Sequence, residues 1–266
     1  MYPFFEANNS GNQDFFNSAI STNFSYPPHL HPYIEIAYVL EGTTEVTIND
    51  HTCTLNAGDS AICFPNDIHS YNNKEFSKIL IFIFSPEITS NFFSKRMNKT
   101  LENSFFTSSL IGSEIAPLFF MLREEFINAN NKYVIKGLLY AILGRFDAHF
   151  KLKNSDHSYN STTQSLLRYI ESHYHENISL DSVAHDLGFS KFYLSRIFSN
   201  KIGYQFNDYV NRLRINKAQK LLSESQLSIT SIAMECGFES QRNFNRIFKE
   251  HTNMTPSEFK NSLLGS

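Results

Sequence analysis

The amino-acid sequence predicts an α+β protein of two domains: an N-terminal β-barrel with a helical hairpin, followed by an all-α domain. Short strand-forming segments separated by turn residues fill residues 19–84. From residue 115 onwards, apolar residues recur at helical spacing instead. A pattern that occurs twice within residues 178–260 indicates that the helical domain contains two copies of one unit.

Six strands are predicted in the N-terminal domain, with turn residues at the breaks between them. The breaks fall at Pro27-Pro28, Glu41-Gly42, Asn49-Asp50 and Ala57-Gly58-Asp59. So many short strands are typical of a barrel or sandwich. Residues 1–18 show no period and are expected to be a loosely attached N-terminal segment. The predicted strands are 19–25, 34–41, 44–49, 52–55, 60–64 and 78–84.

Histidine and glutamate recur at the start of this region in a pattern that suits a binding site. Residues 29, 31 and 35 share one face of an extended strand, so His29, His31 and Glu35 would point together into a barrel, with His69 from another strand. The full spacing, His29-x-His31-x3-Glu35-x6-Gly42 and Gly58-x6-Pro65-x3-His69-x3-Asn73, resembles the two motifs of the cupin superfamily. The resemblance implies a cupin-like barrel, and in metal-binding cupins these His and Glu positions are the ligands.

Three interpretations of this cluster stay open. Imidazole and carboxylate groups suit a divalent metal such as zinc, manganese or iron. The same groups could instead hydrogen-bond a small polar effector such as a sugar, with Tyr33, Tyr38 or Tyr71 as partners. They could also be satisfied polar groups at a barrel mouth. The effector interpretation is favoured and needs no cofactor; its binding residues would be His29, His31, Glu35, Tyr38, His69 and Tyr71.

Two antiparallel helices are predicted after the barrel, in residues 113–150. Each has an apolar stripe at helical spacing, and Asn128-Ala129-Asn130-Asn131 separates them. The stripes would cover the barrel, while Phe120, Met121, Tyr140 and Phe150 add apolar surface beside them, which suggests a homodimer contact. The stripe residues are Ile115, Leu118, Phe119, Leu122 and Phe126 in the first helix, and Val134, Leu138, Leu139, Ile142, Leu143 and Phe146 in the second.

The polar stretch 151–161 is predicted to be a linker between the domains. The predicted boundaries are therefore 1–112 for the barrel, 113–150 for the hairpin, 151–161 for the linker and 162–266 for the helical domain.

The internal repeat in residues 178–260 has the pattern of a helix-turn-helix. Residues 183–189 and 232–238 match 49 positions apart on a small residue, glycine and phenylalanine. Arg196-Ile197-Phe198 and Arg246-Ile247-Phe248 match 50 apart, so the second copy has gained one residue after its Gly-Phe. In each copy a small residue permits close helix crossing, and glycine permits the positive φ of a tight turn.

The helix after each turn keeps one polar face once its apolar residues are buried. Arginine can bind guanine, and glutamine or asparagine can bind adenine, through the major groove. One copy alone could be an ordinary solvated face, but two copies with the same turn, core and polar face favour DNA contact. The candidate DNA-binding residues are Lys191, Phe192, Ser195 and Arg196 in the first copy, and Gln241, Arg242, Asn245 and Arg246 in the second.

Residues 178–260, which end in Phe248-Lys249-x5-Thr255-Pro256-x2-Phe259, resemble the DNA-binding domain of the AraC/XylS transcription regulators. The resemblance implies two recognition helices in successive major grooves, and cupin-like barrels form the effector domain of many such regulators. The family usually has glycine where this chain has Asn253, and asparagine also tolerates the left-handed conformation.

Helix caps and a connecting helix are also predicted in this domain. Ser179 or Asp181 would cap the helix before the first turn, and Ser228 or Thr230 the helix before the second. Between the copies, apolar residues at helical spacing within 209–222 lie on one predicted long helix of about 16 residues, on the order of 24 Å long. Such a connector would hold the recognition helices about 34 Å, or one DNA turn, apart.

Composition excludes several other classes of protein. The net charge of −3 is divided unevenly, because residues 161–266 carry 12 basic and 10 acidic residues whereas residues 1–160 carry 11 and 16. Three cysteines, none in a Cys-x2-Cys pair, argue against a disulfide framework or a cysteine zinc site. The longest apolar run, residues 79–84, is too short to cross a membrane and the N-terminus lacks a basic signal region, so a cytoplasmic protein without a membrane partner is expected.

These features predict a sequence-specific transcription regulator rather than an enzyme. Its partners would be promoter DNA, a small effector, a second copy of the chain and the transcription machinery, and the family resemblance favours activation over repression. Two alternatives remain: a metal-dependent cupin enzyme fused to a DNA-binding domain, and a DNA-binding protein whose barrel is only a dimerisation scaffold.

Overall fold

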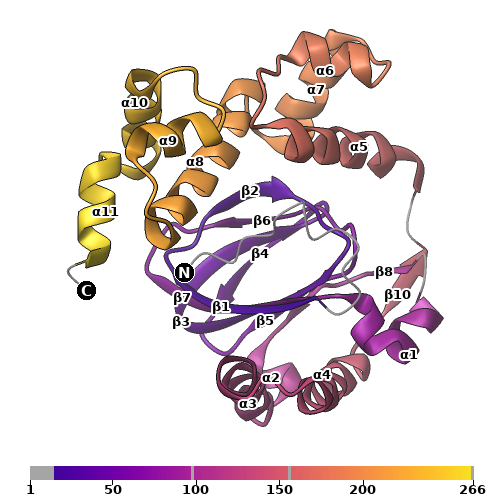
Figure 1. The fold of residues 1–266 in the computed structure, drawn as a ribbon. Coiled ribbons are helices and arrows are strands. Elements are labelled where there is room, and N and C mark those ends of the chain that lie inside the picture. Colours follow the sequence, from indigo (N-terminus) through magenta and orange to yellow (C-terminus); the bar gives the residue numbers. More distant parts are fainter. Residues whose placement is uncertain (1–14, 97–98, 155–156, 265–266) are drawn as a thin grey trace. The chain divides into compact units, whose positions relative to one another are not determined.

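The computed structural model describes residues 15–96, 99–154 and 157–264 (Figure 1). They divide into two compact units, one ending at His157 and the other beginning at Ser158. No helix in these ranges is long and apolar enough to cross a membrane.

The first unit is an antiparallel barrel of eight strands organised around the long strand β3. The first half of β3 pairs with β7 and β5, and its second half pairs with β4 and β6. The remaining pairs are β1 with β7, β2 with β6 and β9 with β5. The bounds are β1 Phe16–Thr22, β2 Tyr26–His29, β3 Ile34–Ile48, β4 His51–Asn56, β5 Ser60–Cys63, β6 His69–Asn72, β7 Ser77–Phe84 and β9 Phe105–Phe106.

Strand β3 changes partners at Glu41-Gly42, where the sequence predicts a break. The register against β7 shifts between Val39 and Glu41, and Gly42 has a φ of 70°. A Cβ at this position would overlap the carbonyl oxygen of Phe76. The turn signal therefore marks a switch within one strand, and the two strands predicted here are wrong.

Three further strand predictions differ from the structure. Phe16 pairs with Phe84, so the predicted N-terminal segment 1–18 gives its last three residues to β1; residues 1–14 lie outside the described part. Pro27 and Pro28 lie inside β2, which pairs only with β6 and so tolerates residues without an N–H. Strand β6 was not predicted, because its polar sequence His-Ser-Tyr-Asn lacks strand-forming aliphatic residues.

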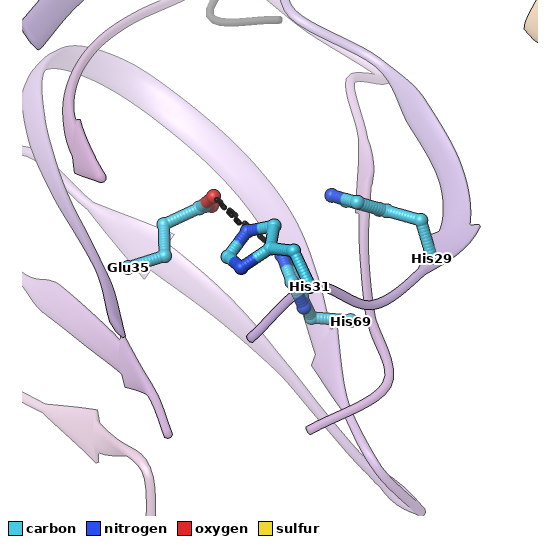
Figure 2. Close-up of side chains that lie close together, drawn as sticks. All are labelled: His29, His31, Glu35 and His69. Carbon is cyan, nitrogen blue, oxygen red and sulfur yellow. Dashed lines mark hydrogen bonds and ion pairs between the residues drawn. The ribbon is translucent and has the colours of Figure 1, made fainter. Parts of the chain in front are cut away.

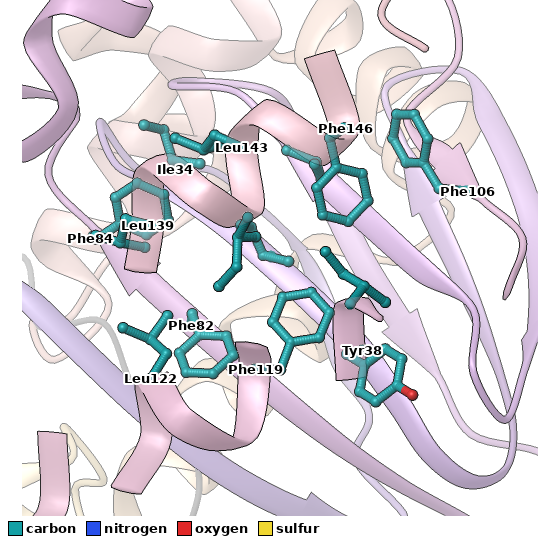
Figure 3. Packing of buried hydrophobic residues seen from close by; sticks show 14 of the residues in the cluster. Ile34, Tyr38, Phe82, Phe84, Phe106, Phe119, Leu122, Leu139, Leu143 and Phe146 are labelled. Carbon is teal, nitrogen blue, oxygen red and sulfur yellow. The ribbon is translucent and has the colours of Figure 1, made fainter. Parts of the chain in front are cut away.

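Alternation along β3 and β7 creates two separate cores. Ala37, Val39 and Ile81 face the barrel interior, whereas Ile34, Ile36 and Phe82 face the helical hairpin. Figure 3 shows this second core, in which side chains of the sheet pack against those of the hairpin. Since both faces are covered, β7 is a continuous apolar run rather than an alternating one.

The predicted hairpin is confirmed as α3 (Ile115–Asn128) and α4 (Lys132–Asp147). The side chain of Asn131 caps α4 by accepting from the backbone N–H groups of Tyr133 and Val134. The prediction of Val134 as a stripe residue is wrong, since it is 41% exposed and Ile135 is buried instead. Ile135 lies one turn before Leu139, so the stripe starts one residue later than predicted.

Short elements connect the barrel to the hairpin and occupy most of the predicted linker. Strand β10 pairs with β8, and α5 begins at His157, so residues 152–154 and 157–161 are regular structure. The polar composition of 151–161 therefore did not mark an unstructured connection; residues 155–156 lie outside the described part. The bounds are η2 Pro86–Thr89, α1 Ser90–Phe93, η3 Ser94–Arg96, β8 Lys99–Leu101, α2 Ser108–Ile111, β10 Leu152–Asn154 and α5 His157–His173.

The second unit is entirely helical and contains the two predicted helix-turn-helix units. Gly188 and Gly237 adopt φ values of 71° and 85° in the turns, and Asn253 is left-handed with a φ of 60°. Ser179 and Ser228, rather than Asp181 and Thr230, cap the helices before the turns. The bounds are α6 Leu180–Asp186, α7 Lys191–Ile197, η4 Phe198–Ile202, α8 Phe206–Glu224, α9 Ile229–Glu235, α10 Gln241–Thr252 and α11 Pro256–Leu264.

Phe119→Ala should destabilise the barrel and hairpin by about 3–5 kcal/mol, because the ring is fully buried and its removal leaves a cavity. It packs 4.9 Å from Tyr38 and 5.7 Å from Phe82 between ring centroids. Amide hydrogen exchange in β7 and α4 would measure the loss locally, which is needed because the chain has two compact units. Phe76→Ala, at a site that is 54% exposed, should cost less than about 1 kcal/mol. Equal effects from the two changes would contradict this packing.

Candidate functional site

The two recognition helices α7 and α10 begin in the same way. Ser190 caps α7 by accepting from the N–H of Tyr193, and Ser240 caps α10 by accepting from that of Asn243. The residue gained in the second copy is therefore Glu239, which stands between the turn and the cap. The eight predicted DNA-binding residues thus fall at equivalent positions of α7 and α10.

Seven of these eight residues are exposed, and Asn245 is half-buried. Phe192, at 74% exposed, is unusual for an aromatic residue unless it has a partner. Tyr193 beside it is 40% exposed and was not predicted. Both aromatic rings interrupt the polar pattern on which the prediction rested.

Exposed polar partners hold several of these side chains. Arg246 donates from Nη1 to Glu250 at 2.7 Å and from Nη2 to Asn243 at 3.0 Å. Lys191 Nζ donates to Asp181 at 2.7 Å, and Gln241 accepts from Thr230 at 2.7 Å. Ion pairs on an exposed surface contribute little stability, so these groups can exchange their partners for DNA at small cost.

The predicted histidine and glutamate cluster is assembled inside the barrel. β2 supplies His29, the following turn His31, β3 Glu35 and β6 His69 (Figure 2). All four are buried, and one ligand atom from each lies within 4.8 Å of the others.

Backbone carbonyls orient the three imidazole rings. His29 Nδ1 lies 3.0 Å from the carbonyl oxygen of Pro27, and His31 Nδ1 lies 3.2 Å from that of Tyr33. His69 Nδ1 lies 2.9 Å from the carbonyl oxygen of Asp67. A protonated Nδ1 in each ring meets these carbonyls, so the Nε2 atoms are left as lone-pair donors.

Two of the imidazoles nevertheless face an acceptor oxygen on both sides. Oε2 of Glu35 lies 3.2 Å from His31 Nε2 and 3.5 Å from His69 Nε2. His69 Nε2 has no hydrogen bond within the described structure. Because a neutral imidazole has one N–H, it cannot satisfy two acceptors. Either a second proton or a cation between the nitrogen and the carboxylate would resolve the conflict.

Burial opposes the second proton at two of the three rings. Burial lowers the pKa of His31, and it lowers the pKa of His29 well below its ordinary value with help from nearby His69. Burial also acts against the charged form of His69, but Glu35 outweighs it and the pKa of His69 is raised. Burial alone would raise the pKa of Glu35; the neighbouring His69 and His31 reverse this and hold it well below its ordinary value. Of the three imidazoles, only that of His69 has its pKa shifted toward the charged form.

The predicted tyrosines divide between the two faces of the sheet. Tyr71 donates from its hydroxyl to Oε1 of Glu35, and Tyr33 lies 6.1 Å from His31 between ring centroids. Tyr38 does not join the cluster, because it is three residues from Glu35 and faces Phe119 of the hairpin. The ring centroid of Tyr26, which was not predicted, lies 4.4 Å from that of His29.

The pocket beside the cluster is small. Its volume is about 10 Å³, which is room for one water molecule or ion and not for a sugar. The lining residues are Phe24, Tyr26, His29, His31, Glu35, Tyr71, Ile81 and Ile83.

Comparison with known families matches both halves of the chain. A helix-turn-helix domain family matches residues 183–262, and a cupin domain family matches residues 20–84. The probable transcription factor PqrA of Proteus vulgaris is 38% identical over 102 residues, which are 38% of this chain and 84% of PqrA.

Other relatives match along nearly the full length. The Msm operon regulatory protein of Streptococcus mutans is 26% identical over 250 residues, 90% of this chain and 88% of that protein. Among solved structures, ToxT from Vibrio cholerae bound to (E)-4-(8-methylnaphthalen-1-yl)but-3-enoic acid has a TM-score of 0.58 at 15% identity, covering 93% of this chain and 99% of ToxT. The likeness to ToxT shows a shared fold.

Proposed function

Because the chain belongs to the AraC family of helix-turn-helix transcription regulators, we propose that a divalent metal ion bound in its barrel controls its binding to promoter DNA. The relatives are named as regulators, which supports this role over that of an enzyme. A regulator that binds promoter DNA has to be in the same compartment as the chromosome. In a bacterium this compartment is the cytoplasm, where we expect the protein to act.

The conflict around Glu35 carries the metal proposal. His29, His31, Glu35 and His69 would hold the ion, since three imidazole nitrogens and one carboxylate oxygen suit zinc, manganese, iron or nickel. A cation would accept the lone pairs of the Nε2 atoms and neutralise the buried carboxylate at the same time. The carbonyl partners of all three Nδ1 atoms are those expected of metal-binding histidines.

A small organic effector, such as a sugar, is the second candidate. One ToxT structure is described with an unsaturated fatty acid bound. In this chain an organic ligand would need the side chains around the 10 Å³ pocket to move apart, which an ion does not require. The metal ion is therefore placed first.

The ligand can change DNA affinity only if it binds one arrangement of the two units more tightly than another. A coupling of about 1–3 kcal/mol between ligand and DNA is typical of such control.

Metal binding can be tested by calorimetry on the full chain after treatment with a chelator. One of zinc, manganese, iron or nickel should bind with one ion per chain, and His31→Ala should weaken it by more than about tenfold. His51→Ala removes an exposed histidine outside the cluster and should leave affinity unchanged. If wild type and His31→Ala bind each ion equally, the metal proposal fails. If the ion binds but leaves DNA affinity unchanged, its regulatory role fails.

DNA contact can be tested with duplexes selected from a random library by the full chain. Arg196→Ala and Arg246→Ala should each weaken binding by about 1–3 kcal/mol, roughly 5- to 150-fold, because each removes a groove contact. Lys74→Ala removes the same charge from an exposed site between β6 and β7, away from the hairpin, and should have no effect. Unchanged binding by both arginine variants would refute the proposed DNA face.

We further propose activation through contact with the transcription machinery, so transcription from the selected site should rise with the wild type and not with the arginine variants.

We also propose a homodimer through the hairpin. Its support is the exposure of large apolar side chains on α3 and α4: Met121 is 56% exposed, Ile127 53% and Tyr133 88%. Linking two DNA-binding units would raise affinity without new contacts, which matters for a domain of net charge only +2.

Light scattering after size exclusion should give a dimer for the wild-type full chain. The double variant Met121→Asp/Tyr133→Asp should be a monomer, because dimerisation would bury its two added carboxylates. Tyr193→Asp, at an exposed tyrosine of the other unit, should stay dimeric. A wild-type monomer at micromolar concentration would exclude the proposed interface.

A further inference from the structure

The two helix-turn-helix units share α8 but have separate cores. At the start of α8, Phe206 and Tyr209 pack on Phe198, with ring centroids 5.4 and 5.7 Å away. At its end, Ile215, Ala218 and Leu222 belong to the core of the second unit. A single connecting helix can still bend and twist along its length. By itself, α8 therefore does not fix the angle between α7 and α10.

A second connection runs through residues 174–177, which join α5 to α6. Arg214, in the middle of α8, donates from Nε to the carbonyl oxygen of Tyr174 at 2.6 Å and from Nη2 to that of Glu176 at 2.7 Å. The guanidinium carbon also lies 5.6 Å from the ring centroid of Phe238, a buried residue of the second unit. One planar group therefore ties the segment before the first helix-turn-helix to the core of the second.

The same segment lies against the second turn. A Cβ on Gly237 would overlap the carbonyl oxygen of His175 and lie 2.7 Å from its carbonyl carbon. A Cβ on Gly188, the equivalent residue of the first turn, would meet nothing within 4 Å. The backbone contact is thus specific to the second copy and is not a general need of the turn.

The residue gained by the second copy takes part in this contact. Asn177 Nδ2 donates to Oε1 of Glu239 at 3.3 Å. Glu239 has no counterpart in the first copy, where Phe189 is followed directly by the cap Ser190. The insertion that breaks the repeat therefore lies where the second copy meets the 174–177 segment.

We infer that Arg214, Gly237 and residues 174–177 form a brace that fixes the spacing and angle between α7 and α10, and so sets the separation of the two DNA half-sites that the chain accepts. These are positioning residues, since they act through the recognition helices. The inference depends on the proposed DNA binding. Inserting one base pair between half-sites moves them by about 3.4 Å and rotates them, which a rigid pair of helices tolerates poorly.

The test uses the full chain and the selected duplex, together with versions that have one base pair added or removed between the half-sites. Wild type should prefer the selected spacing by about tenfold or more. Arg214→Gln and Gly237→Ala should bind the selected spacing more weakly and lose most of that preference. Arg214→Lys keeps the charge but not the planar fork, and its preference should fall between wild type and Arg214→Gln.

Gly188→Ala is the matched control, because it imposes the same left-handed strain without a clash. It should keep the wild-type spacing preference even if its affinity falls. Should Gly237→Ala fail to fold, Arg214→Gln tests the brace independently. Circular dichroism should first show that Arg214→Gln is folded. If the folded variant then keeps the wild-type spacing preference, the inference is overturned. Failure of wild type to select any duplex would instead reject DNA binding itself.

Discussion

Strand β3 can serve both halves of the barrel only because residue 42 has no side chain. A Cβ there would overlap the carbonyl oxygen of Phe76, and the φ of 70° would strain any other residue. With glycine in place, the strand continues and changes partners from β7 and β5 to β4 and β6. This path brings β6, and with it His69, beside Glu35. The cluster thus depends on a backbone contact between Gly42 and Phe76, neither of which belongs to it.

The alternation of β3 decides which residues can take part in the site. Glu35 and Ala37 face the interior, and Ile36 and Tyr38 face the hairpin. The same rule placed His29, His31 and Glu35 together and should have excluded Tyr38, whose position is odd in spacing from Glu35. Tyr26 could not be predicted from spacing, since it reaches His29 through a strand whose two prolines read as a break. Sequence therefore predicted the titratable groups of the site and its partner Tyr71, but missed Phe24 and Tyr26 beside them.

Glycine, asparagine and serine made the helical unit more predictable than the barrel. The turns, caps and left-handed Asn253 follow from local chemistry that a sequence displays directly. Strand β6 and the pairing of β10 with β8 depend instead on distant partners, and their own residues are polar. A polar segment is then predicted to be a loop or linker, because nothing in its own sequence indicates the distant strand with which it pairs.

The repeat also shows why two copies of one unit need not stay equivalent. Both turns require a glycine for its positive φ, yet only Gly237 has a backbone packed against it. The turn at Gly188 can face solvent. The turn at Gly237 instead has to fit against residues 174–177, which lead into the first copy. A chain that joins two copies head to tail creates this one asymmetric contact, and the extra Glu239 lies within it. Divergence at the second turn follows from the geometry of joining the copies, while the caps Ser190 and Ser240 keep the two recognition helices equivalent beyond it.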